Sequence, residues 1–438
     1  MSDKRERICV LGMGYIGLPT ASILATQGFE VLGVDVNPHV VETLSAGRLH
    51  IQEPGLDTVV KASVISGHLK VALEPAEADV FIIAVPTPLR HGDENATEPK
   101  VDLSYVEKAT SAILPHLKAG NLVILESTSP PGTTEDVVGK LLREAGWKPG
   151  EDIFLCHCPE RVLPGKILRE LTQNDRVIGG VNMESAERAR DIYRSFCGGN
   201  IFLTDATTAE LCKLVENSYR DVNIAFANEL AAVARRFEVD VYDVIELANK
   251  HPRVNILNPG PGVGGHCISV DPWFLVEYAP EETALIHQAR KTNDHRPVEV
   301  ASEILQLCQK HNAKNVSVLG VTYKQDVDDT RESPSTAIIA ALKQELGDEN
   351  VRVHDPLVDS NAYEYPLETL FNAIEGSEMI VFLVPHREFK LIDPSSLGEI
   401  VKNKVVVDYM NCIEHEKWAA TEFNVYKMGL REVGVLAT

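Results

Sequence analysis

The stretch ICVLGMGYIGLPTASILATQGFEVLGVD, residues 8–35, decides the fold of the amino-terminal part of the chain. Its apolar run over residues 8–12 predicts a buried strand, residues 18–27 predict a helix, and residues 30–35 predict a second strand. The turn between the first strand and the helix, GMGYIG at residues 12–17, matches the pattern G-x-G-x-x-G. Strand, glycine turn and helix in this order indicate the first βαβ unit of a dinucleotide-binding domain.

Each glycine of this turn has a physical role. Gly12 permits the tight turn, Gly14 lets the backbone approach a pyrophosphate, and Gly17 allows the helix to pack closely. Asp35 ends the second strand, 18 residues after Gly17 (35 − 17), and we expect it to bind both ribose hydroxyls and to repel a 2′-phosphate. NAD is therefore favoured over NADP. The alternative is an ordinary glycine-rich turn, which the combined context disfavours.

Three further apolar runs, at residues 80–86, 121–127 and 153–158, read as strands buried on both faces. With helical stretches between them, they predict a parallel, doubly wound α/β domain. Thr87 and Thr128 follow two of these strands, at the carboxyl edge of the sheet where open α/β folds bind ligands. Both are candidate cofactor contacts, although each taken alone is more often a simple loop hydroxyl.

Length and composition exclude several classes of protein. The 438 residues correspond to about three domains. The net charge, 42 − 64 = −22, disfavours nucleic acid and anionic membrane as partners, so an anionic small ligand would need arginines or lysines gathered at one site. No run approaches the roughly 20 apolar residues of a membrane span, and the start, MSDKRER, does not resemble a signal peptide. We expect a cytoplasmic protein without a disulfide framework.

The rest of the chain predicts a helical centre followed by a second α/β series. Residues 204–238 read as one long helix and residues 241–249 as another, followed by a loop rich in Pro and Gly at residues 252–265. Strands are expected at residues 316–321, 351–354, 378–384 and 404–408. The predicted fold is α/β, with a Rossmann-like NAD domain (1–203), a central helical domain with one long helix (204–305) and a Rossmann-like C-terminal domain (306–438).

The loop NPGPGVGGHCISVD, residues 258–271, carries the candidate nucleophile Cys267. Four glycines within six residues remove side chains from the approach to this sulfur, so a bulky substrate could reach it. A thiol can attack a carbonyl where its thiolate is favoured. The following cysteines are expected to be buried small hydrophobes, as is usual: Cys9, Cys156, Cys197, Cys212, Cys308 and Cys412.

Lys213, Asn217 and Arg220 fall on one face of the long helix, within roughly 60° of one another. A cation and an amide directed at one point can stabilise an oxyanion on a substrate carbon. The alternative is a solvated polar stripe, and the neighbouring Cys267 loop favours the functional interpretation.

Glu160 and Arg161 follow the fifth predicted strand, again at the carboxyl edge. Glu160 could serve as general base for a water molecule and Arg161 could hold an anionic ligand. Cys156-His157-Cys158 lacks a second ligand pair, and alternation along a strand points His157 away from both cysteines. No metal site is therefore expected.

A nicotinamide cofactor together with a thiol nucleophile implies more than alcohol oxidation. Hydride removal converts an alcohol to an aldehyde, the thiolate adds to it, and a second hydride removal leaves a thioester that water converts to an acid. These residues predict a four-electron oxidation of a primary alcohol to a carboxylate. A two-electron dehydrogenase or an epimerase with bound NAD would not need the thiol, and a regulatory NAD-binding protein would not need the catalytic set.

Motifs throughout residues 8–410 also resemble a known family, the UDP-glucose/GDP-mannose dehydrogenases. The resemblance is carried by GMGYIGLPT, AVPTP, ESTSPPGTTE, CPERVLPG, ELCKLVENSYRDVNIAFANE, PGPGVGGHCISVDPWF and GVTYKQDVDDTRESPS. It implies an NAD-binding domain, a central helical domain, a UDP-binding C-terminal domain and a homodimer or dimer of dimers. The stretch HPRVNILNPGPGVGGHCISVDPWF looks most like members that oxidise UDP-N-acetyl-D-mannosamine, although members that act on UDP-N-acetylglucosamine share the GGHC loop.

The resemblance also implies roles for individual residues. Cys267 matches the nucleophile, Lys213, Asn217 and Asp271 match the groups that handle the proton and the oxyanion, and Glu160 matches the carboxylate of thioester hydrolysis. Arg253 is expected to reach into a neighbouring subunit. The remaining matches are cofactor contacts at Tyr15, Ile16, Asp35, Thr87, Thr128 and Arg331, and UDP-sugar contacts at Arg161, Val162, Lys213, Asn217, Arg220, His251, Arg253, Gly264, Tyr323 and Lys324.

One position departs from the family pattern. Members commonly place a basic residue two positions after the aspartate that ends the last strand, but here Asp408 is followed by Tyr409 and Met410. Either Lys417 or another group replaces it, or the uracil end is held differently.

Overall fold

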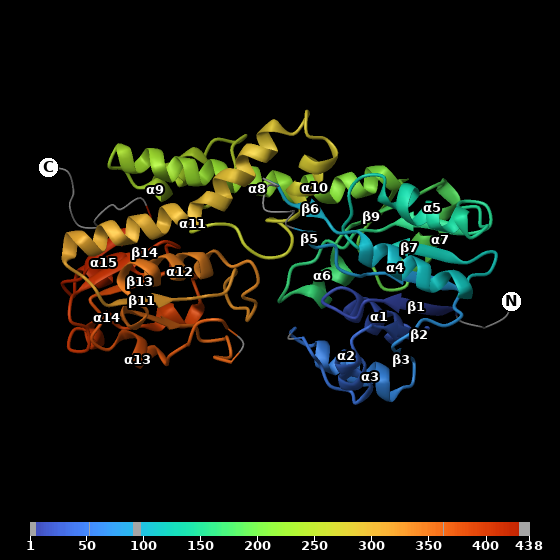
Figure 1. Cartoon of the computed structure of the whole chain (residues 1–438), viewed down its shortest axis with the longest axis horizontal. Helices are drawn as coiled ribbons and strands as arrows, with labels where there is room; N and C mark the ends of the chain where they lie inside the picture. Colours follow the sequence, from blue (N-terminus) through green and yellow to red (C-terminus); the bar gives the residue numbers. More distant parts are fainter. Residues whose placement is uncertain (1–5, 52, 91–97, 362, 429–438) are drawn as a thin grey trace. The chain divides into compact units, whose positions relative to one another are not determined.

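The computed structural model describes residues 6–51, 53–90, 98–361 and 363–428. The chain divides into two compact units, one formed by Met1–Glu216 with Trp273–Ala279 and the other by Asn217–Pro272 with Pro280–Thr438. Figure 1 labels the helices and strands of both units. Each unit contains its own β-sheet, and each is described by itself below.

The first unit contains an eight-stranded sheet with the order β10-β9-β8-β7-β4-β1-β2-β3. Six of these strands pair in parallel in the order of a Rossmann fold, namely β3, β2, β1, β4, β7 and β8. Strand β9 runs antiparallel to β8. The strands are β1 (Arg7–Leu11), β2 (Glu30–Val34), β3 (Leu69–Ala72), β4 (Val80–Ile83), β7 (Leu122–Leu125), β8 (Phe154–His157), β9 (Arg176–Gly180) and β10 (Ile201–Asp205). A separate two-stranded antiparallel sheet pairs β5 (Leu89–Arg90) with β6 (Lys100–Val101).

The central strands of this sheet are buried on both faces, and their successive side chains enter opposite cores. Ile8 and Val10 of β1 belong to one core, while Cys9 and Leu11 belong to the other. Helices α1, α2, α3 and α7 contribute to the first core and α4 and α5 to the second. The helices are α1 (Gly17–Thr26), α2 (Pro38–Ser45), α3 (Leu56–Ile65), α4 (Ser104–Ile113), α5 (Gly139–Glu144), α6 (Ile167–Gln173) and α7 (Met183–Tyr193).

The second unit contains a five-stranded, all-parallel sheet with the order β12-β11-β13-β14-β15. This is the other common doubly wound order. Its strands are β11 (Val316–Leu319), β12 (Val351–His354), β13 (Met379–Phe382), β14 (Val405–Asp408) and β15 (Asn424–Lys427).

Long helices cover one face of the second sheet. Apolar side chains of α8, α9, α11 and α12 form one core with it, and those of α13, α14 and α15 help to form the other. These helices are α8 (Ala206–Arg236), α9 (Val241–Ala248), α11 (Ala284–His311), α12 (Pro334–Leu346), α13 (Leu370–Ile374), α14 (Pro394–Leu397) and α15 (His415–Ala419). Helix α10 (Asp271–Tyr278) is shared between the two units, which divide after Pro272. Short 3₁₀ or π turns lie at Leu114–His116, Thr134–Val138, Asp348–Asn350 and Arg387–Leu391.

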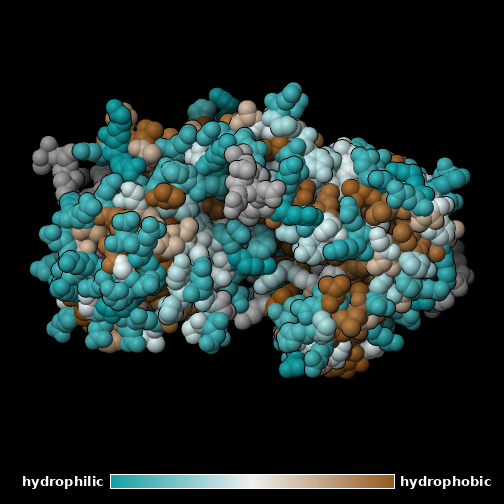
Figure 2. Space-filling model, in the orientation of Figure 1, coloured by the Kyte–Doolittle hydropathy of each residue, from teal (hydrophilic) through white to brown (hydrophobic). Residues whose placement is uncertain are grey.

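The predicted fold class is confirmed: the chain contains two doubly wound sheets and, between them in the sequence, a helical segment with a long helix, α8, close to the predicted 204–238. The sequence analysis did not anticipate a second long helix, α11, or the strands β3, β9, β10 and β15. No helix of the described residues is long and apolar enough to cross a membrane. The face of the molecule in Figure 2 is mostly hydrophilic, with scattered hydrophobic patches.

Candidate functional site

The glycine turn of the first unit has the shape that a dinucleotide requires. A Cβ atom at Gly17 would lie 1.8 Å from the carbonyl oxygen of Gly12, and Gly12 itself has a φ of +91°. At Gly14 a Cβ atom would meet nothing within 4 Å, so the backbone there is open to a ligand. The turn opens into the first residues of α1, where backbone N–H groups favour phosphate. The geometry therefore fits the pyrophosphate of NAD.

Asp35 follows β2 and is partly buried beside the same turn. Its Oδ2 accepts a hydrogen bond from the backbone N–H of Met13 at 3.0 Å, and its Oδ1 accepts one from Asn37 at 2.9 Å. A carboxylate has about four acceptor sites, so positions remain for ribose hydroxyls. Asp35 thus also stabilises the turn, a role that sequence analysis missed.

The other predicted contacts of the first unit lie near strand ends. The hydroxyl of Thr87 donates to the carbonyl oxygen of Thr128 at 2.8 Å, so the structure brings these two candidates together. Tyr15 and Val162, predicted for different ligands, pack against one small apolar cluster that includes Ile23. Ile16 immediately precedes α1.

Glu160 lies beyond the end of β8 and is only 8% exposed. Its Oε1 accepts the backbone N–H of Arg161 at 2.8 Å, and its Oε2 accepts Nη2 of Arg176 at 2.9 Å. The guanidinium of Arg161 pairs with Glu216, its Nη2 lying 2.5 Å from Oε1. Lys213, a candidate on α8, is 9% exposed.

Cys267 is the one exposed cysteine among the eight; Cys212 is half-buried and the other six are buried. The backbone N–H groups of Val270 and Asp271 donate to the Cys267 carbonyl oxygen at 3.0 and 2.8 Å, which forms a turn at the start of α10. In the second unit Nδ2 of Asn217 donates to Oδ2 of Asp271 at 2.5 Å. Two of the predicted catalytic residues are therefore in contact, and the turn that carries Cys267 ends on one of them.

The glycines of the Cys267 loop also have a packing role, which the sequence did not indicate. A Cβ atom at Gly264 or Gly265 would lie 2.9 or 2.8 Å from side-chain atoms of Tyr323, and one at Gly262 would lie 2.8 Å from Pro334. These glycines allow the loop to pack against residues 323–334. The same packing brings the candidate contacts Gly264 and Tyr323 together.

The remaining candidates of the second unit differ in their surroundings. Arg220, His251 and Arg253 are exposed, and Tyr323 and Lys324 are half-buried. Arg331, predicted to contact the cofactor, donates to both carboxylate oxygens of Asp329, at 2.8 and 2.6 Å.

The carboxylate of Asp408 stabilises the turn after β14. It accepts the backbone N–H groups of Met410, Cys412 and Ile413 and faces Nε2 of His415 at 2.9 Å. Lys417, one possible replacement for the family's basic residue, lies 3.5 Å from Asp393 instead.

Sequence analysis missed two buried ionic groups beside these residues. In the first unit, Arg176 and Glu126 adjoin Glu160. No motif pointed to Arg176, and Glu126 begins the motif ESTSPPGTTE without a predicted role. In the second unit, Arg290 pairs with Asp221 and also donates to the carbonyl oxygen of Ile268 at 3.3 Å, next to Cys267. The sequence signal that could have identified Arg290 and Asp221 is that each is a charged residue whose spacing places it on the buried face of a helix.

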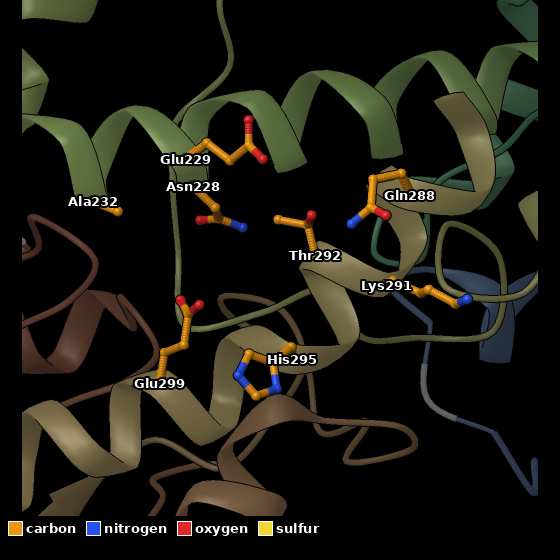
Figure 3. Close-up of a pocket in the computed structure, with 8 residues that line it drawn as sticks. All are labelled: Asn228, Glu229, Ala232, Gln288, Lys291, Thr292, His295 and Glu299. Carbon is orange, nitrogen blue, oxygen red and sulfur yellow. The ribbon is translucent and has the colours of Figure 1, made fainter. Parts of the chain in front are cut away.

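A hollow of about 370 Å³ lies between α8 and α11 in the second unit (Figure 3). Its lining is polar and includes Glu229, Lys291, His295 and Glu299. None of the predicted site residues lines it. Within the described part of the chain, no group of three or more His, Cys, Asp or Glu side chains could hold a metal ion.

Comparison with known proteins gives a consistent result along the whole chain. The NAD binding domain of the UDP-glucose/GDP-mannose dehydrogenase family matches residues 6–197, its central domain residues 207–295 and its UDP binding domain residues 317–415. The UDP-N-acetyl-D-mannosamine dehydrogenase of Methanocaldococcus jannaschii is 50% identical over 427 residues, covering 97% of this chain and 96% of the relative.

Two further relatives agree. An NDP-N-acetyl-D-galactosaminuronic acid dehydrogenase of Ralstonia nicotianae is 46% identical over 412 residues, with 92% of this chain and 95% of the relative covered. The solved structure of UDP-D-ManNAc dehydrogenase from Pyrococcus horikoshii superposes with a TM-score of 0.90 at 41% identity, covering 98% of this chain and all of that one. The chain belongs to the UDP-glucose/GDP-mannose dehydrogenase family.

Proposed function

We propose that this protein oxidises the primary alcohol of UDP-N-acetyl-D-mannosamine to a carboxylate in two NAD-dependent steps. The observation that carries the proposal is the exposed thiol of Cys267 in a turn that ends on the Asn217–Asp271 pair. The substrate is supported by the relatives and the solved structure that bear the name of this activity at 41–50% identity. The half-reactions sum to RCH₂OH + H₂O + 2 NAD⁺ → RCOO⁻ + 2 NADH + 3 H⁺.

The thiolate of Cys267 is assigned to attack the aldehyde carbon. The new C–S bond leaves an oxyanion, which the Lys213 ammonium and the Asn217 amide are assigned to stabilise. Asp271 accepts a hydrogen bond from Asn217, so it holds the amide in one orientation. Bound NAD supplies the hydride acceptor for both oxidations. The Gly12–Gly17 turn and Asp35 are assigned to hold it, with Tyr15, Ile16, Thr87, Thr128 and Arg331 as further contacts.

Glu160 is assigned to release the product. Its carboxylate accepts a proton from water as the water oxygen bonds to the thioester carbon; the C–S bond then breaks and Cys267 leaves as thiolate. Glu160 has an Arg176 guanidinium beside it and is almost fully buried, which keeps the carboxylate in one place.

The UDP moiety brings negative charge to a protein of net charge −22, so its site needs local cations. Arg161, Arg220, Arg253 and Lys324 are assigned to this role. Val162, His251, Gly264 and Tyr323 are the remaining proposed contacts.

A panel of UDP-N-acetylmannosamine, UDP-N-acetylglucosamine, UDP-N-acetylgalactosamine and UDP-glucose, followed by NADH absorbance, tests the substrate. The highest kcat/KM is expected with UDP-N-acetylmannosamine. The galactosamine sugar is included because one relative at 46% identity is named for that configuration. A clear preference for another member of the panel would contradict the assigned substrate while leaving the reaction class in place.

Homodimerisation is part of the proposal. Tyr219, Phe226 and Val233 of α8 are between 49% and 60% exposed. Their spacing of seven residues places them on one face of the helix, within about 40°. Such an apolar stripe suits the same helix of a second copy. Light scattering should give the mass of a dimer or tetramer, and Phe226→Glu should shift it toward the monomer; a monomeric wild type would contradict the proposal.

Two further assignments stay predictions. The division into domains at 1–203, 204–305 and 306–438 would be tested by limited proteolysis with cuts near residues 203 and 305. A cytoplasmic location would be tested by cell fractionation.

A further inference from the structure

The antiparallel strand β9 brings a buried arginine to the candidate base Glu160. Because β9 runs against β8, its first residue, Arg176, lies at the carboxyl end of β8, where Glu160 follows. A parallel β9 would have placed Arg176 at the opposite edge of the sheet. Arg176 is 3% exposed and Glu160 is 8% exposed, so water screens their interaction little.

Two aromatic rings also contact the guanidinium of Arg176. Its central carbon lies 4.7 Å from the ring centroid of Tyr193 and 5.4 Å from that of Phe196. A guanidinium stacked on aromatic faces in a desolvated site has little freedom to rotate. Its Nη2 donates to Oε2 of Glu160 at 2.9 Å, so the rings fix the direction from which the carboxylate is held.

A second carboxyl group closes this network. The hydroxyl of Tyr193 donates to Oε1 of Glu126 at 2.9 Å, and Glu126 is 2% exposed at the end of β7. Burial, together with the nearby charge of Glu160, raises the pKa of Glu126 to about 8. At neutral pH Glu126 is therefore mostly protonated and uncharged, so Glu160 is the carboxylate that pairs with the positive charge of Arg176.

The hydrogen bonds leave Glu160 able to act on water. Oε1 accepts the backbone N–H of Arg161 and Oε2 accepts Arg176, one donor for each oxygen. Each carboxylate oxygen has two lone pairs, so one remains on each. The carboxylate is thus fixed in orientation but keeps a free acceptor position for a proton.

We propose that Arg176, held by Tyr193 and Phe196, is a positioning residue that orients Glu160 for hydrolysis of the thioester on Cys267. The inference rests on the proposed function and adds a residue that acts on only one of its steps. The two oxidations do not require Glu160, so loss of Arg176 should slow product release and leave NADH formation in the first turnover intact.

The test compares full-length Arg176→Gln, Arg176→Lys, Tyr193→Phe and Glu160→Gln with the wild type, using UDP-N-acetylmannosamine and NAD. Rapid mixing follows the NADH burst, and mass spectrometry after acid quench detects the sugar adduct on Cys267. For Arg176→Gln we expect a burst close to that of the wild type, a steady-state rate lower by roughly 100-fold, and an accumulated adduct. Arg176→Lys keeps the positive charge but not the planar guanidinium, so its steady-state rate should lie between those of the wild type and Arg176→Gln.

Controls separate positioning from a general loss of structure. Arg188→Gln removes another partly buried arginine of the first unit, one that pairs with Glu6, and should behave as the wild type. The double variant Glu160→Gln/Arg176→Gln restores charge balance, so it keeps the test informative if Arg176→Gln does not fold. Its hydrolysis should be no slower than that of Glu160→Gln alone, because Arg176 acts through Glu160.

Two outcomes would overturn the inference. If the Arg176 variants lose burst and steady state in equal proportion without any adduct, or if the double variant shows additive losses, Arg176 does not act through Glu160. If the wild type forms no NADH from any UDP-sugar of the panel, the proposed function fails and this inference fails with it.

Discussion

Alanine substitutions at Gly14 and Gly17 should have opposite effects on folding and on NAD binding. A methyl group at Gly17 would lie 1.8 Å from the carbonyl oxygen of Gly12 and 3.3 Å from Cβ of Ala84. An ordinary contact is about 3.5 Å, so the start of α1 would have to move by more than an ångström. Overpacking of this kind costs about 1–3 kcal/mol, and more where backbone is involved.

Gly14→Ala should not carry this cost, since its methyl group would meet nothing within 4 Å. Its free energy of unfolding should stay within about 0.5 kcal/mol of the wild type. The methyl group would instead occupy the path by which the backbone approaches the pyrophosphate. We expect the Kd for NAD to rise at least tenfold, which corresponds to about 1.4 kcal/mol.

Urea unfolding measures the first quantity and titration calorimetry with NAD measures the second, both on the full-length protein. The prediction is a stable Gly14→Ala variant that binds NAD weakly and a Gly17→Ala variant that is clearly destabilised. A Gly14→Ala variant with wild-type affinity would refute the assignment of this turn to the pyrophosphate, and a fully stable Gly17→Ala would refute the packing argument.

Three further predictions concern buried charge. Glu126 has a folded-state pKa of about 8 against an ordinary 4.5, raised mainly by burial, so the native state binds one more proton than the unfolded chain between these values. The contribution of Glu126 to the free energy of unfolding is complete below pH 4.5 and is lost as the pH rises to 8, by about 1.4 kcal/mol per pH unit. Glu126→Gln should remove this pH dependence, as measured by urea titrations at several pH values. An unchanged dependence in the variant would contradict the prediction. His157 has the opposite sign: burial lowers its pKa from 6.5 to about 3, so its contribution is present above pH 6.5 and lost as the pH falls, and His157→Phe should be less sensitive to acid between pH 6.5 and 3. An equally acid-sensitive variant would argue against a buried neutral imidazole. Asp221 and Arg290 are both fully buried and paired, so Asp221→Ala should lower the free energy of unfolding by about 3–5 kcal/mol, and a loss below 1 kcal/mol would show that the pair contributes little.

Local sequence patterns predicted the first βαβ unit closely because each of its signals is local. The apolar run, the glycine turn and the acidic strand end all lie within residues 8–35, and the structure has β1, α1 and β2 within one residue of the predicted bounds. Strand β9 carries two glycines, Gly179 and Gly180, and does not read as a strand from its own sequence. Helix α11 contains Pro297, a residue that normally marks a break. Tertiary packing overrides these local preferences.

In the candidate site, too, local patterns identified some residues, while others depend on tertiary structure. Residue types at strand ends and in the Cys267 loop pointed to Glu160 and Cys267 without knowledge of the fold, and the family resemblance added Asp271. Arg176 could not be found in this way, because its proximity to Glu160 depends on the direction in which β9 joins the sheet. The packing role of the loop glycines could not be predicted either, since Tyr323, which packs against them, lies far along the chain.

The central claim is that one sugar is oxidised twice before it leaves Cys267. Its most direct test is the amount of NADH formed per UDP-N-acetylmannosamine when a limiting amount of the sugar is consumed completely by the wild type. The account predicts two NADH for each sugar, with the carboxylate as product, and no such turnover by Cys267→Ser. One NADH for each sugar, or two that do not depend on Cys267, would contradict it.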